Sequence, residues 1–470
     1  MQTDNVNLTV NGNRKLKCPK GSNLFKVLSD AGYMFSGNCG GRGMCERCLV
    51  YISGIGSVKS CGYIVMSDID VTVKKDSTSI LTGYQAEDGT ESDAVTFQSE
   101  SDPDALGIAV DLGTTTVAME LVQLATGVTI SQHGFLNPQI KYGSDVISRI
   151  KKGSTRDGLE ELEKAIKSGL ADGISSMTDH PEHISKMVIS GNTTMNSILE
   201  DMTLENLGHF PFEIKNPDVI SMNGEVFFGD KTYSCMTVIC LPNLSAFVGA
   251  DALCGALICG LDRLDSYQLF ADLGTNGELI LAKRTKGYAT SCACGPAFEG
   301  MLKREAVMPT TAFDFLYTMK NMKIVSDDGV LADRFITSGY SPANGVRIDM
   351  DMIHSFLLAK AAICAGIDAL IDMAGISAED ISGVYIAGGF GCSLKINSAT
   401  GLGLFPDCFG AKSEFAGNSS LHGAHKCLLD DAFIDRINEF KSILTAVNLG
   451  ELDGFDRKYY SHMDLRSWDI

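Results

Sequence analysis

The 470-residue sequence predicts an α/β protein that carries a small β-rich domain in front of a larger region. From residue 105 onward, strand-like and helix-like segments alternate, which is typical of α/β architecture. The strand–turn–strand unit that opens this region, ALGIAVDLGTTTVAMELVQLATG, recurs about 160 residues later as LFADLGTNGELILAKRTKG. We therefore expect two related halves that face each other.

The first 85 residues predict the small domain. NVNLTVNGNRKLKCP alternates apolar and polar residues around the turn NGN, which indicates a hairpin. GSNLFKVLSDAGY predicts a short helix with Ser22 as its N-cap, ended by Gly32. DIDVTVKK predicts a final strand.

An acidic segment, residues 86–104, follows the small domain. It holds seven Asp and Glu and no Lys or Arg, a composition typical of a solvated linker. Beyond the two copied units, AKAAICAGIDALIDMAGI predicts an amphipathic helix, and GVYIAGGFG a buried strand that runs into a glycine turn.

The overall composition excludes several classes of protein. The net charge of −19 disfavours binding to nucleic acid or anionic lipid. No apolar run reaches the roughly 18 residues that a membrane span needs, and the first residues lack the apolar core of a secretory signal. Fifteen cysteines in such a chain indicate a reducing cytoplasm, where clustered cysteines are metal ligands more often than disulfides.

A glycine-rich loop, SGNCGGRGMCERCLV, carries clustered cysteines. Cys39, Cys45, Cys48 and Cys61 follow the spacing C-x5-C-x2-C-x12-C, which is close to the plant-type ligand pattern of [2Fe–2S] clusters. Glycines between them let the backbone approach the cluster and direct N–H groups at sulfur. Structural zinc is the alternative, although zinc sites of four cysteines usually carry two CxxC motifs. We expect a [2Fe–2S] cluster, with Cys61 as the ligand that fits the spacing least well.

The first copied unit predicts a phosphate-binding loop. Asp111 ends a strand, and Gly113, Thr114 and Thr115 form the turn. Gly113 permits close approach of the backbone to phosphate, and the threonine hydroxyls and turn N–H groups can donate hydrogen bonds to it. Asp111 would repel phosphate, so its expected role is to hold Mg²⁺ through water.

The second copy offers the same parts at Asp272, Gly274, Thr275 and Asn276, and the glycine turn at Gly388, Gly389 and Phe390 follows at a distance. Two ordinary hairpin turns are the alternative. The repetition, together with the later glycine turn, favours a nucleotide site.

These segments resemble motifs of the ATPase superfamily of actin, sugar kinases and heat-shock chaperones: AVDLGTTTVAM its first phosphate motif, ADLGTNGELIL its second and YIAGGFG its adenosine motif. The cysteine-bearing domain and the segments NPQIKYGSDVISRI, ISGNTTMNSIL, LGHFPFE, LPNLSAFVGADALCGAL, CGPAFEG and AKAAICAGIDALI narrow the choice. Together they resemble the ATP-dependent reductive activators of corrinoid enzymes, including those of anaerobic O-demethylase systems, over nearly the whole chain.

This resemblance implies a ferredoxin-like β-grasp [2Fe–2S] domain at 1–85, the linker at 86–104, and a two-lobed actin-like ATPase of duplicated RNase H-like fold, with lobes at 105–245 and 246–470. It implies roles at the residues named above: iron ligation by the four cysteines, handling of Mg²⁺ and phosphate by the two aspartate loops, and contact with adenosine by the glycine turn. Gly191 and Asn192 would form a connecting or nucleotide-proximal turn.

The implied function is ATP-dependent transfer of one electron from the [2Fe–2S] cluster to inactive cobalt(II) of a corrinoid protein, which restores cobalt(I). An external low-potential electron donor and a homodimer are further implied. Three alternatives stay open: a small-molecule kinase with an iron–sulfur sensor, a nucleotide-gated ferredoxin docking module without ATP turnover, and an activator of a radical dehydratase.

Several other residues have a plain interpretation. We expect Cys18 and Cys364 to be buried, and Cys292 and Cys294, at positions where the family more often has small non-thiol residues, to serve packing rather than redox chemistry. We expect His209 to lie in the core or on a partner surface rather than to ligate cobalt. Trp468 docks either on the body of the protein or on a partner.

Overall fold

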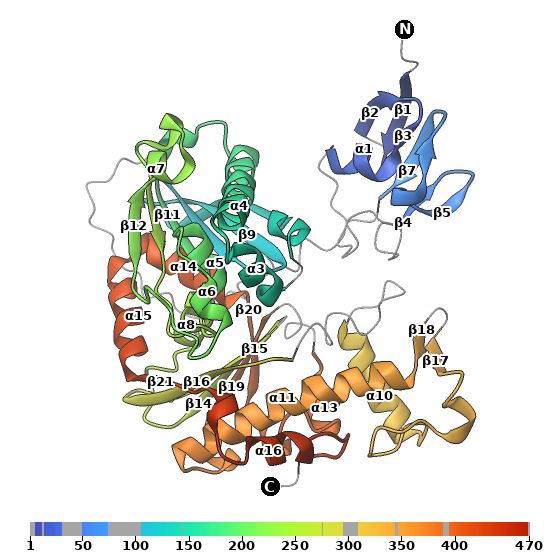
Figure 1. Ribbon diagram of the computed structural model, residues 1–470, viewed down its shortest axis with the longest axis vertical. Helices are drawn as coiled ribbons and strands as arrows, with labels where there is room; N and C mark the ends of the chain where they lie inside the picture. The colour runs from blue at the N-terminus through green and yellow to red at the C-terminus, as the bar shows by residue number, and fades with distance from the viewer. Residues whose placement is uncertain are drawn as a thin grey trace. The chain divides into compact units, whose positions relative to one another are not determined.

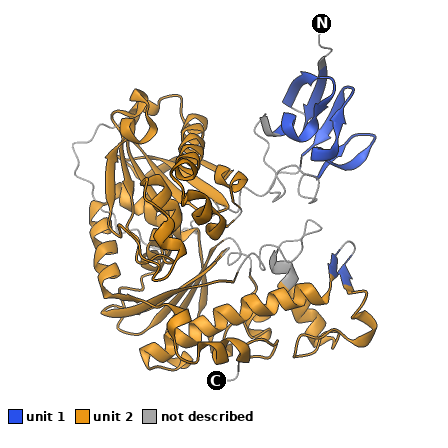
Figure 2. Ribbon diagram, in the orientation of Figure 1, with its two compact units in different colours: residues 1–78, 302–308, 341–347 blue, residues 79–301, 309–340, 348–470 orange. Residues whose placement is uncertain are grey.

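The computed structural model describes residues 5–11, 14–30, 49–73, 105–143, 145–274, 276–294, 309–343, 346–388 and 394–468. The chain divides into two compact units (Figure 2). The small unit comprises residues 1–78 with 302–308 and 341–347, and the large unit comprises the other residues.

The small unit is built on a five-stranded sheet with the strand order β2-β1-β7-β4-β5. The hairpin expected at the N-terminus is confirmed, since β1 and β2 pair antiparallel, and β7 adds to β1 in parallel. The elements are β1 Asn5–Val10, β2 Arg14–Pro19, β3 Ser22–Asn23, α1 Leu24–Asp30, β4 Leu49–Ile52, β5 Gly56–Lys59, η1 Ser60–Gly62, β6 Ile64–Val65 and β7 Ile69–Thr72. Leu8, Leu24, Leu28 and Ile52 are fully buried in one core between α1 and the sheet.

Helix α1 begins differently from the expectation. Ser22 does not cap it, because its hydroxyl donates to the carbonyl of Pro19 at 2.6 Å. The Asn23 side chain accepts the hydrogen bond of the Lys26 N–H at 3.2 Å instead. The capping residue is therefore one position later. Cys18 is buried on β2, as expected.

The large unit contains two six-stranded sheets with the same inner pattern (Figure 1). Each has three consecutive antiparallel strands and two later strands that add in parallel beside the first of them. The first sheet is, in spatial order, β10 Val128–Leu136, β9 Thr116–Gln123, β8 Leu106–Leu112, β11 Ile184–Gly191, β13 Thr237–Cys240 and β12 Ile220–Asn223. The second is β20 Ser413–Gly417, β19 Gly383–Ala387, β14 Gln268–Leu273, β15 Gly277–Lys283, β16 Lys286–Cys292 and β21 Leu444–Ala446. This duplication confirms the expected two related halves.

The helices of the large unit are α3 Val146–Gly153, α4 Arg156–Met177, α5 Thr193–Leu199, α6 Glu205–Gly208, α7 Gly224–Phe228, α8 Ala250–Ile258, α10 Pro309–Asn321, α11 Met350–Ala374, α13 Ile396–Gly401, α14 Ser419–Leu429, α15 Asp431–Ile443 and α16 Phe455–Ser461. Short 3-10 turns are η2 Pro138–Lys141, η3 Pro181–His183, η4 Lys231–Tyr233, η5 Asp333–Phe335, η6 Ala378–Asp380, η7 Asp407–Phe409 and η8 Leu449–Glu451, and a two-stranded sheet joins β17 Tyr340–Ala343 to β18 Val346–Ile348.

Helices α8 and α14 connect the two sheets. Helix α14 packs on β8 and β11 of the first sheet and on α8, and α8 also contacts β14 and β15 of the second. Residues of both sheets, including Val188 and Phe270, share one core with Leu253 of α8 and Leu421 of α14. A helix from the C-terminal part of the chain thus completes the first sheet.

Helix α11 is longer and more buried than the sequence indicates. Residues 359–367 are all buried, so the expected amphipathic pattern is wrong for the middle of this helix. The reason is that β15 and β16 and, separately, α16 pack against it (Figure 1). Even Lys360 is buried there, and its ammonium donates to the carbonyl of Asp464 at 2.7 Å.

The remaining expectations on single residues can be compared directly. Cys292, Cys294 and Cys364 are buried, as residues that serve packing would be, and His209 is exposed. The Trp468 ring lies 4.5 Å from the His462 ring, centre to centre, and its backbone pairs with Pro406, so the tryptophan docks on the large unit itself. Within the described residues, no helix is long and apolar enough to span a bilayer.

Candidate nucleotide site

The first aspartate loop joins β8 to β9, and two asparagine side chains hold it. Asn137 donates to the carbonyl of Gly113 at 2.9 Å, and its own N–H donates to the carbonyl of Thr115 at 2.9 Å. Asn192 donates to the Thr114 hydroxyl at 2.9 Å. A Cβ atom on Gly113 would lie 2.7 Å from a backbone oxygen, so the turn has room only for glycine. The loop is therefore held in place before any ligand binds.

A buried arginine supports the same loop. Arg149 of α3 is fully buried and donates to the carbonyls of Thr114 and Gly143 and to the side chain of Gln139. Burial lowers the pKa of its guanidinium to about 10, which leaves it charged at neutral pH. Because its hydrogen bonds go to carbonyl and amide oxygens, the charge also makes the back of the loop electropositive.

Two residues from α14 hold the Asp111 carboxylate. The Ser420 hydroxyl donates to one oxygen at 2.7 Å, and the Asn418 amide donates to the other at 3.0 Å. Ser420 also lies 3.0 Å from the Ser190 hydroxyl on β11. Burial raises the pKa of Asp111, and these two hydrogen bonds offset part of that effect.

The second aspartate loop joins β14 to β15 and lies at the position in the second sheet that corresponds to the first loop in the first sheet. Asp272 lies opposite Ala387 in the register of β14 with β19, just as Asp111 lies opposite Ser190 on β11. The next residue is a glycine in both cases. A Cβ atom on Gly388, whose φ is +86°, would lie 2.4 Å from the Asp272 carboxylate. The Gly274 N–H donates to the carbonyl of Asn276 at 2.9 Å, which closes the turn.

Four carboxyl groups gather around the two loops. Burial, together with Asp251 and Asp111, raises the pKa of Asp272 to about 8. Burial raises the pKa of Asp251 and of Glu278 as well, with a contribution from neighbouring carboxylates. Glu278 lies directly opposite Asp272 across the β14–β15 pair, an arrangement that like charges disfavour. All four side chains are only partly buried, so the site stays accessible.

This arrangement fits a divalent cation that keeps much of its water. Carboxylates that raise one another's pKa are stabilised by a nearby cation. Within the described residues, however, no group of three or more His, Cys, Asp or Glu side chains is placed to hold a metal ion directly. Mg²⁺ is commonly bound through one or two carboxylates, waters and the phosphates of a substrate. The residues present therefore fit Mg²⁺ bound together with a nucleotide.

The structure brings most of the predicted nucleotide residues together. Both aspartates and their glycines lie at the corresponding ends of β8 and β14, and Gly388 touches Asp272. Thr275, Gly389 and Phe390 lie outside the described residues, as do Cys39, Cys45 and Cys48.

Cys61, the fourth predicted iron ligand, is half-buried on η1 of the small unit. Its carbonyl accepts a hydrogen bond from Asn23 at 2.8 Å. Leu49, the residue after Cys48, pairs with Lys59, two positions before Cys61. The open end of the β4–β5 hairpin thus carries both Leu49, next to Cys48, and Lys59, close to Cys61. This arrangement fits two ligands of one cluster.

Sequence reasoning missed Asn418, Ser420, Asp251, Glu278 and Arg149. Arg149 lies in the segment NPQIKYGSDVISRI, in which no local pattern indicates that an arginine will be buried. For Asn418 the available signal was the run Asn-Ser-Ser ahead of an apolar helix, which is an N-cap pattern. Its side chain does accept the Leu421 N–H at 3.0 Å.

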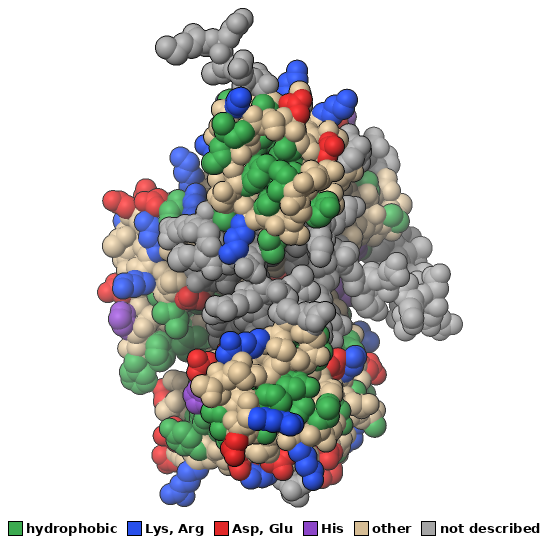
Figure 3. All heavy atoms as spheres, turned by 90° about the vertical axis from the view of Figure 1, so that its right-hand side faces the viewer, with side chains coloured by type: hydrophobic (Ala, Val, Ile, Leu, Met, Phe, Trp, Pro, Cys, Tyr) green, Lys and Arg blue, Asp and Glu red, His purple; other side chains and the backbone are tan. Residues whose placement is uncertain are grey.

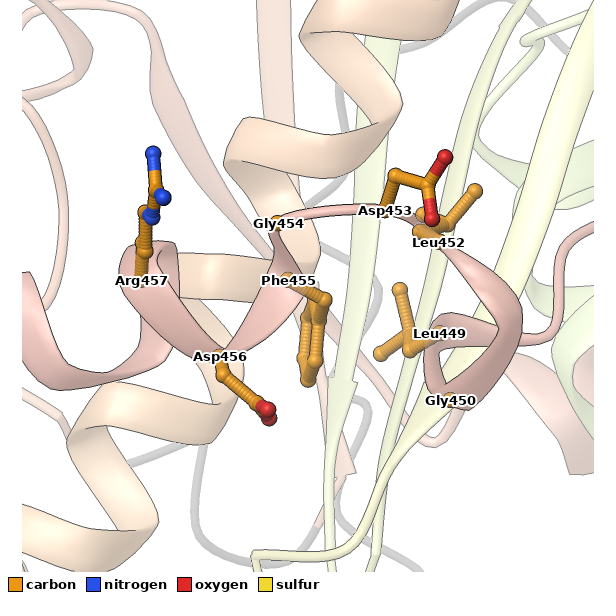
Figure 4. Close-up of a pocket in the computed structure, with 8 residues that line it drawn as sticks. All are labelled: Leu449, Gly450, Leu452, Asp453, Gly454, Phe455, Asp456 and Arg457. Atoms are coloured by element: carbon orange, nitrogen blue, oxygen red, sulfur yellow. The ribbon is translucent and has the colours of Figure 1, made fainter.

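A depression of about 540 Å³ lies away from these residues, on the segment from η8 to α16 (Figure 4). Leu449, Leu452 and Phe455 face one another there, while Asp456 and Arg457 point outward. Among the residues that the structure describes, one short stretch of chain lines it, and no predicted site residue belongs to that stretch. We assign no ligand to it.

The duplicated sheets, each with an aspartate loop at the end of its first strand, define a nucleotide-binding protein of the actin-like ATPase class. Comparison with known families agrees. The model of the RACo middle region matches residues 106–264, and the model of the C-terminal domain of RACo, the ASKHA domain, matches residues 266–306 and 314–470. The chain therefore belongs to the RACo family, the reductive activators of corrinoid proteins.

Individual relatives are consistent with this membership. The corrinoid activation enzyme RamQ of Eubacterium limosum is 29% identical over 77% of this chain and 70% of its own length. The Co(II) methylated amine-specific corrinoid protein reductase of Methanosarcina barkeri is 22% identical over 73% of each chain. The solved structure of a reductive activator for corrinoid, iron–sulfur protein covers 99% of both chains with a TM-score of 0.71 at 23% identity, which supports the fold.

Proposed function

We propose that this protein binds and hydrolyses ATP to drive one electron from a [2Fe–2S] cluster to the inactive cobalt(II) of a corrinoid protein, restoring cobalt(I). The observation that carries the proposal is the pairing of Asp111 and Asp272 on equivalent loops of a fold whose family models are those of a corrinoid activator. In this reading the relatives' activity on corrinoid proteins extends to this chain.

The energetics explain why a nucleotide would be needed. Plant-type clusters have reduction potentials near −400 mV, and the proposed cobalt acceptor is harder to reduce than that. Changing a 1:99 balance into 99:1 requires about 5.5 kcal/mol, which is roughly 240 mV for one electron. A protein that binds the two cobalt states with different affinity in its different nucleotide states can supply such a difference.

The residues of the large unit have defined tasks in this proposal. The Gly113–Thr115 turn and the Gly274–Asn276 turn bind phosphate from the two halves. Asp111 and Asp272 orient a hydrated Mg²⁺ on the phosphates, and Ser420 keeps the Asp111 carboxylate in position. Because one phosphate chain would contact both loops, its cleavage would change how strongly the halves are held together.

The small unit supplies the electron. Cys39, Cys45, Cys48 and Cys61 would hold the cluster, which contributes one-electron transfer when bound. The proposed division of the chain is 1–85 for the ferredoxin-like domain, 86–104 for a linker, and 105–245 and 246–470 for the two ATPase lobes. An external low-potential donor reloads the cluster, and the active form is a homodimer.

Reduction of a purified cobalt(II) corrinoid protein tests the coupling. With a chemical reductant present, formation of cobalt(I) is followed by its visible absorption in the presence of ATP, of ADP or of no nucleotide. We expect the wild type to reduce cobalt(II) only when ATP is present. The D272N variant should no longer carry out this ATP-dependent reduction, whereas D265N, which changes an exposed aspartate outside the site, should retain it. Equal reduction with and without ATP would overturn the proposal.

The iron site has its own test. The C61S variant should lose most of its iron and sulfide, whereas C235S, which changes an exposed cysteine of the large unit, should keep them. A chain that carries stoichiometric zinc and no iron after anaerobic purification would contradict the assigned cluster.

A further inference from the structure

The small unit differs from the rest of the chain in the sign of its charge. Residues 1–85 contain 10 Lys and Arg against 6 Asp and Glu, a net charge of +4, and residues 86–470 contain 29 against 52, a net charge of −23. A basic domain on so acidic a protein attracts acidic partners that the rest of the chain repels. Any acidic protein that approaches is therefore steered toward the small unit.

Three of these ten basic residues line one depression. It has a volume of about 680 Å³ and lies between the edge strand β2 and helix α1. Arg14, Lys17 and Lys26 line it, together with Leu16, Val27 and the small residues between them, and none of the described residues in its lining is acidic. Lys17 and Lys26 are exposed, and neither forms an ion pair with any residue in the described part of the chain. Their charge is available to a partner.

The depression adjoins a predicted iron ligand. Asn23 lines it and donates to the carbonyl of Cys61 at 2.8 Å. Asn23 also pairs with Ile64 across β3 and β6, and both Ile64 and the nearby Met66 are about half exposed. Exposed apolar residues beside charged ones are typical of protein interfaces. Figure 3 looks onto the other side of the small unit, where β5 lies in Figure 1, and shows a separate group of hydrophobic side chains with Lys, Arg, Asp and Glu side chains at its margin.

We infer that the β2–α1 surface, defined by Arg14, Lys17, Lys26, Ile64 and Met66, is where an acidic electron-donor protein docks to reduce the cluster. The inference rests on the proposed function, because it takes the cluster as the point at which electrons enter. In the step, one electron leaves the reduced donor and enters the cluster, and no bond is formed or broken. A charged surface beside the cluster suits this step, since electrostatic attraction raises the association rate of short-lived complexes.

Lysines on an edge strand have a structural explanation as well, because they discourage pairing with other sheets. That explanation applies to Lys17 on β2 but not to Lys26, which lies on α1. It predicts a change in aggregation when the lysines are replaced, and no change in binding.

Direct binding tests the inference without depending on the cluster. The probe is an oxidised acidic flavodoxin, and its dissociation constant with the full-length protein is measured by calorimetry at low ionic strength and in about 1 M salt, where the Debye length is only about 3 Å. We expect binding at low ionic strength that is lost in high salt. K17E/K26E should weaken it about tenfold or more, and K17A/K26A by a smaller factor in the same direction.

The matched control is K164E/K215E, which makes the same change of net charge at two exposed lysines of the large unit. It should change the dissociation constant less than about twofold, because the two lysines do not belong to the proposed surface. Equal weakening by both double variants, or unchanged binding by K17E/K26E with a native circular dichroism spectrum, would overturn the docking surface.

A second measurement separates this inference from the proposed function. With cationic methyl viologen as the reductant, K17E/K26E should retain ATP-dependent reduction of the cobalt(II) corrinoid protein, while its cluster reduction by reduced flavodoxin slows about tenfold. If the variant instead fails with methyl viologen and binds flavodoxin normally, the surface serves the corrinoid protein and the inference is wrong. If the wild type shows no ATP dependence, the proposed function fails while the binding result still stands.

Discussion

Replacing Glu200 with glutamine should make the large unit less sensitive to alkaline pH. Glu200 follows the last residue of α5, and both of its carboxylate oxygens are buried without a hydrogen-bond partner among the described residues. A negative charge there is disfavoured by burial and by the partial negative charge at the helix C-terminus. Burial raises the pKa of Glu200 to about 8.

The size of the effect follows from this pKa. The unfolded carboxyl loses its proton near the ordinary value of 4.5 and the folded one near 8. Between these values the folded protein binds more protons, so its stability falls as the pH rises and levels off above pH 8. Each pKa unit corresponds to about 1.4 kcal/mol. The advantage of E200Q over the wild type should therefore grow by about 2 kcal/mol between pH 6 and pH 8.

Urea unfolding at a series of pH values measures this difference. Trp468 is the single tryptophan of the chain and packs on the large unit, so its fluorescence follows that unit alone. A constant offset between E200Q and the wild type is expected from the buried amide and carries no information. E439Q, at an exposed position of α15, should show no pH-dependent difference. If the difference for E200Q were also independent of pH, Glu200 would be ionised in the folded protein and the reasoning would fail.

Three further substitutions probe the loops. G388A should abolish nucleotide binding measured with a fluorescent ATP analogue, because the added Cβ would lie 2.4 Å from the Asp272 carboxylate. The control is G229A, at a glycine with φ +69° and open space around it, which should cost only about 1 kcal/mol of stability. S420A should weaken ATP binding about 10- to 150-fold, the equivalent of one lost hydrogen bond to a charged group, and S442A should not. R149K should lower the free energy of unfolding by about 2–4 kcal/mol in urea titrations, since lysine cannot serve three separated acceptors; a loss below about 0.5 kcal/mol would refute the support assigned to this arginine.

The sequence allowed the main architecture to be predicted because the relevant signals are local. The repeated Asp-Leu-Gly-Thr unit identifies Asp111 and Asp272 as strand ends, and the register of both sheets confirms them as equivalent positions. Alternation around Asn11 was enough to predict the first hairpin. By contrast, Ser22 and Asn23 are adjacent residues that can both cap a helix, and the sequence alone does not decide which of them caps α1.

Contacts between distant parts of the chain could not be predicted in this way. Ser420 is 309 positions from the Asp111 carboxylate that it binds, and no periodicity or spacing in a single sequence connects them. The burial of Lys360 has the same origin, because a segment about 100 residues later covers a face of α11 that would otherwise be polar. Tertiary packing determines both the Ser420–Asp111 hydrogen bond and the burial of Lys360, and both are compatible with the local sequence preferences.

The position of α14 has a consequence for the synthesis of the protein. The helix that completes the first sheet and binds Asp111 begins at Ser419, near the end of the chain. While the ribosome is still translating, the N-terminal half of the large unit must wait with an incompletely covered sheet and an Asp111 carboxylate that lacks its Asn418 and Ser420 donors. A nascent chain that stops before α14 would expose apolar surface of β8 and β11, which makes it a substrate for chaperones and prone to aggregate.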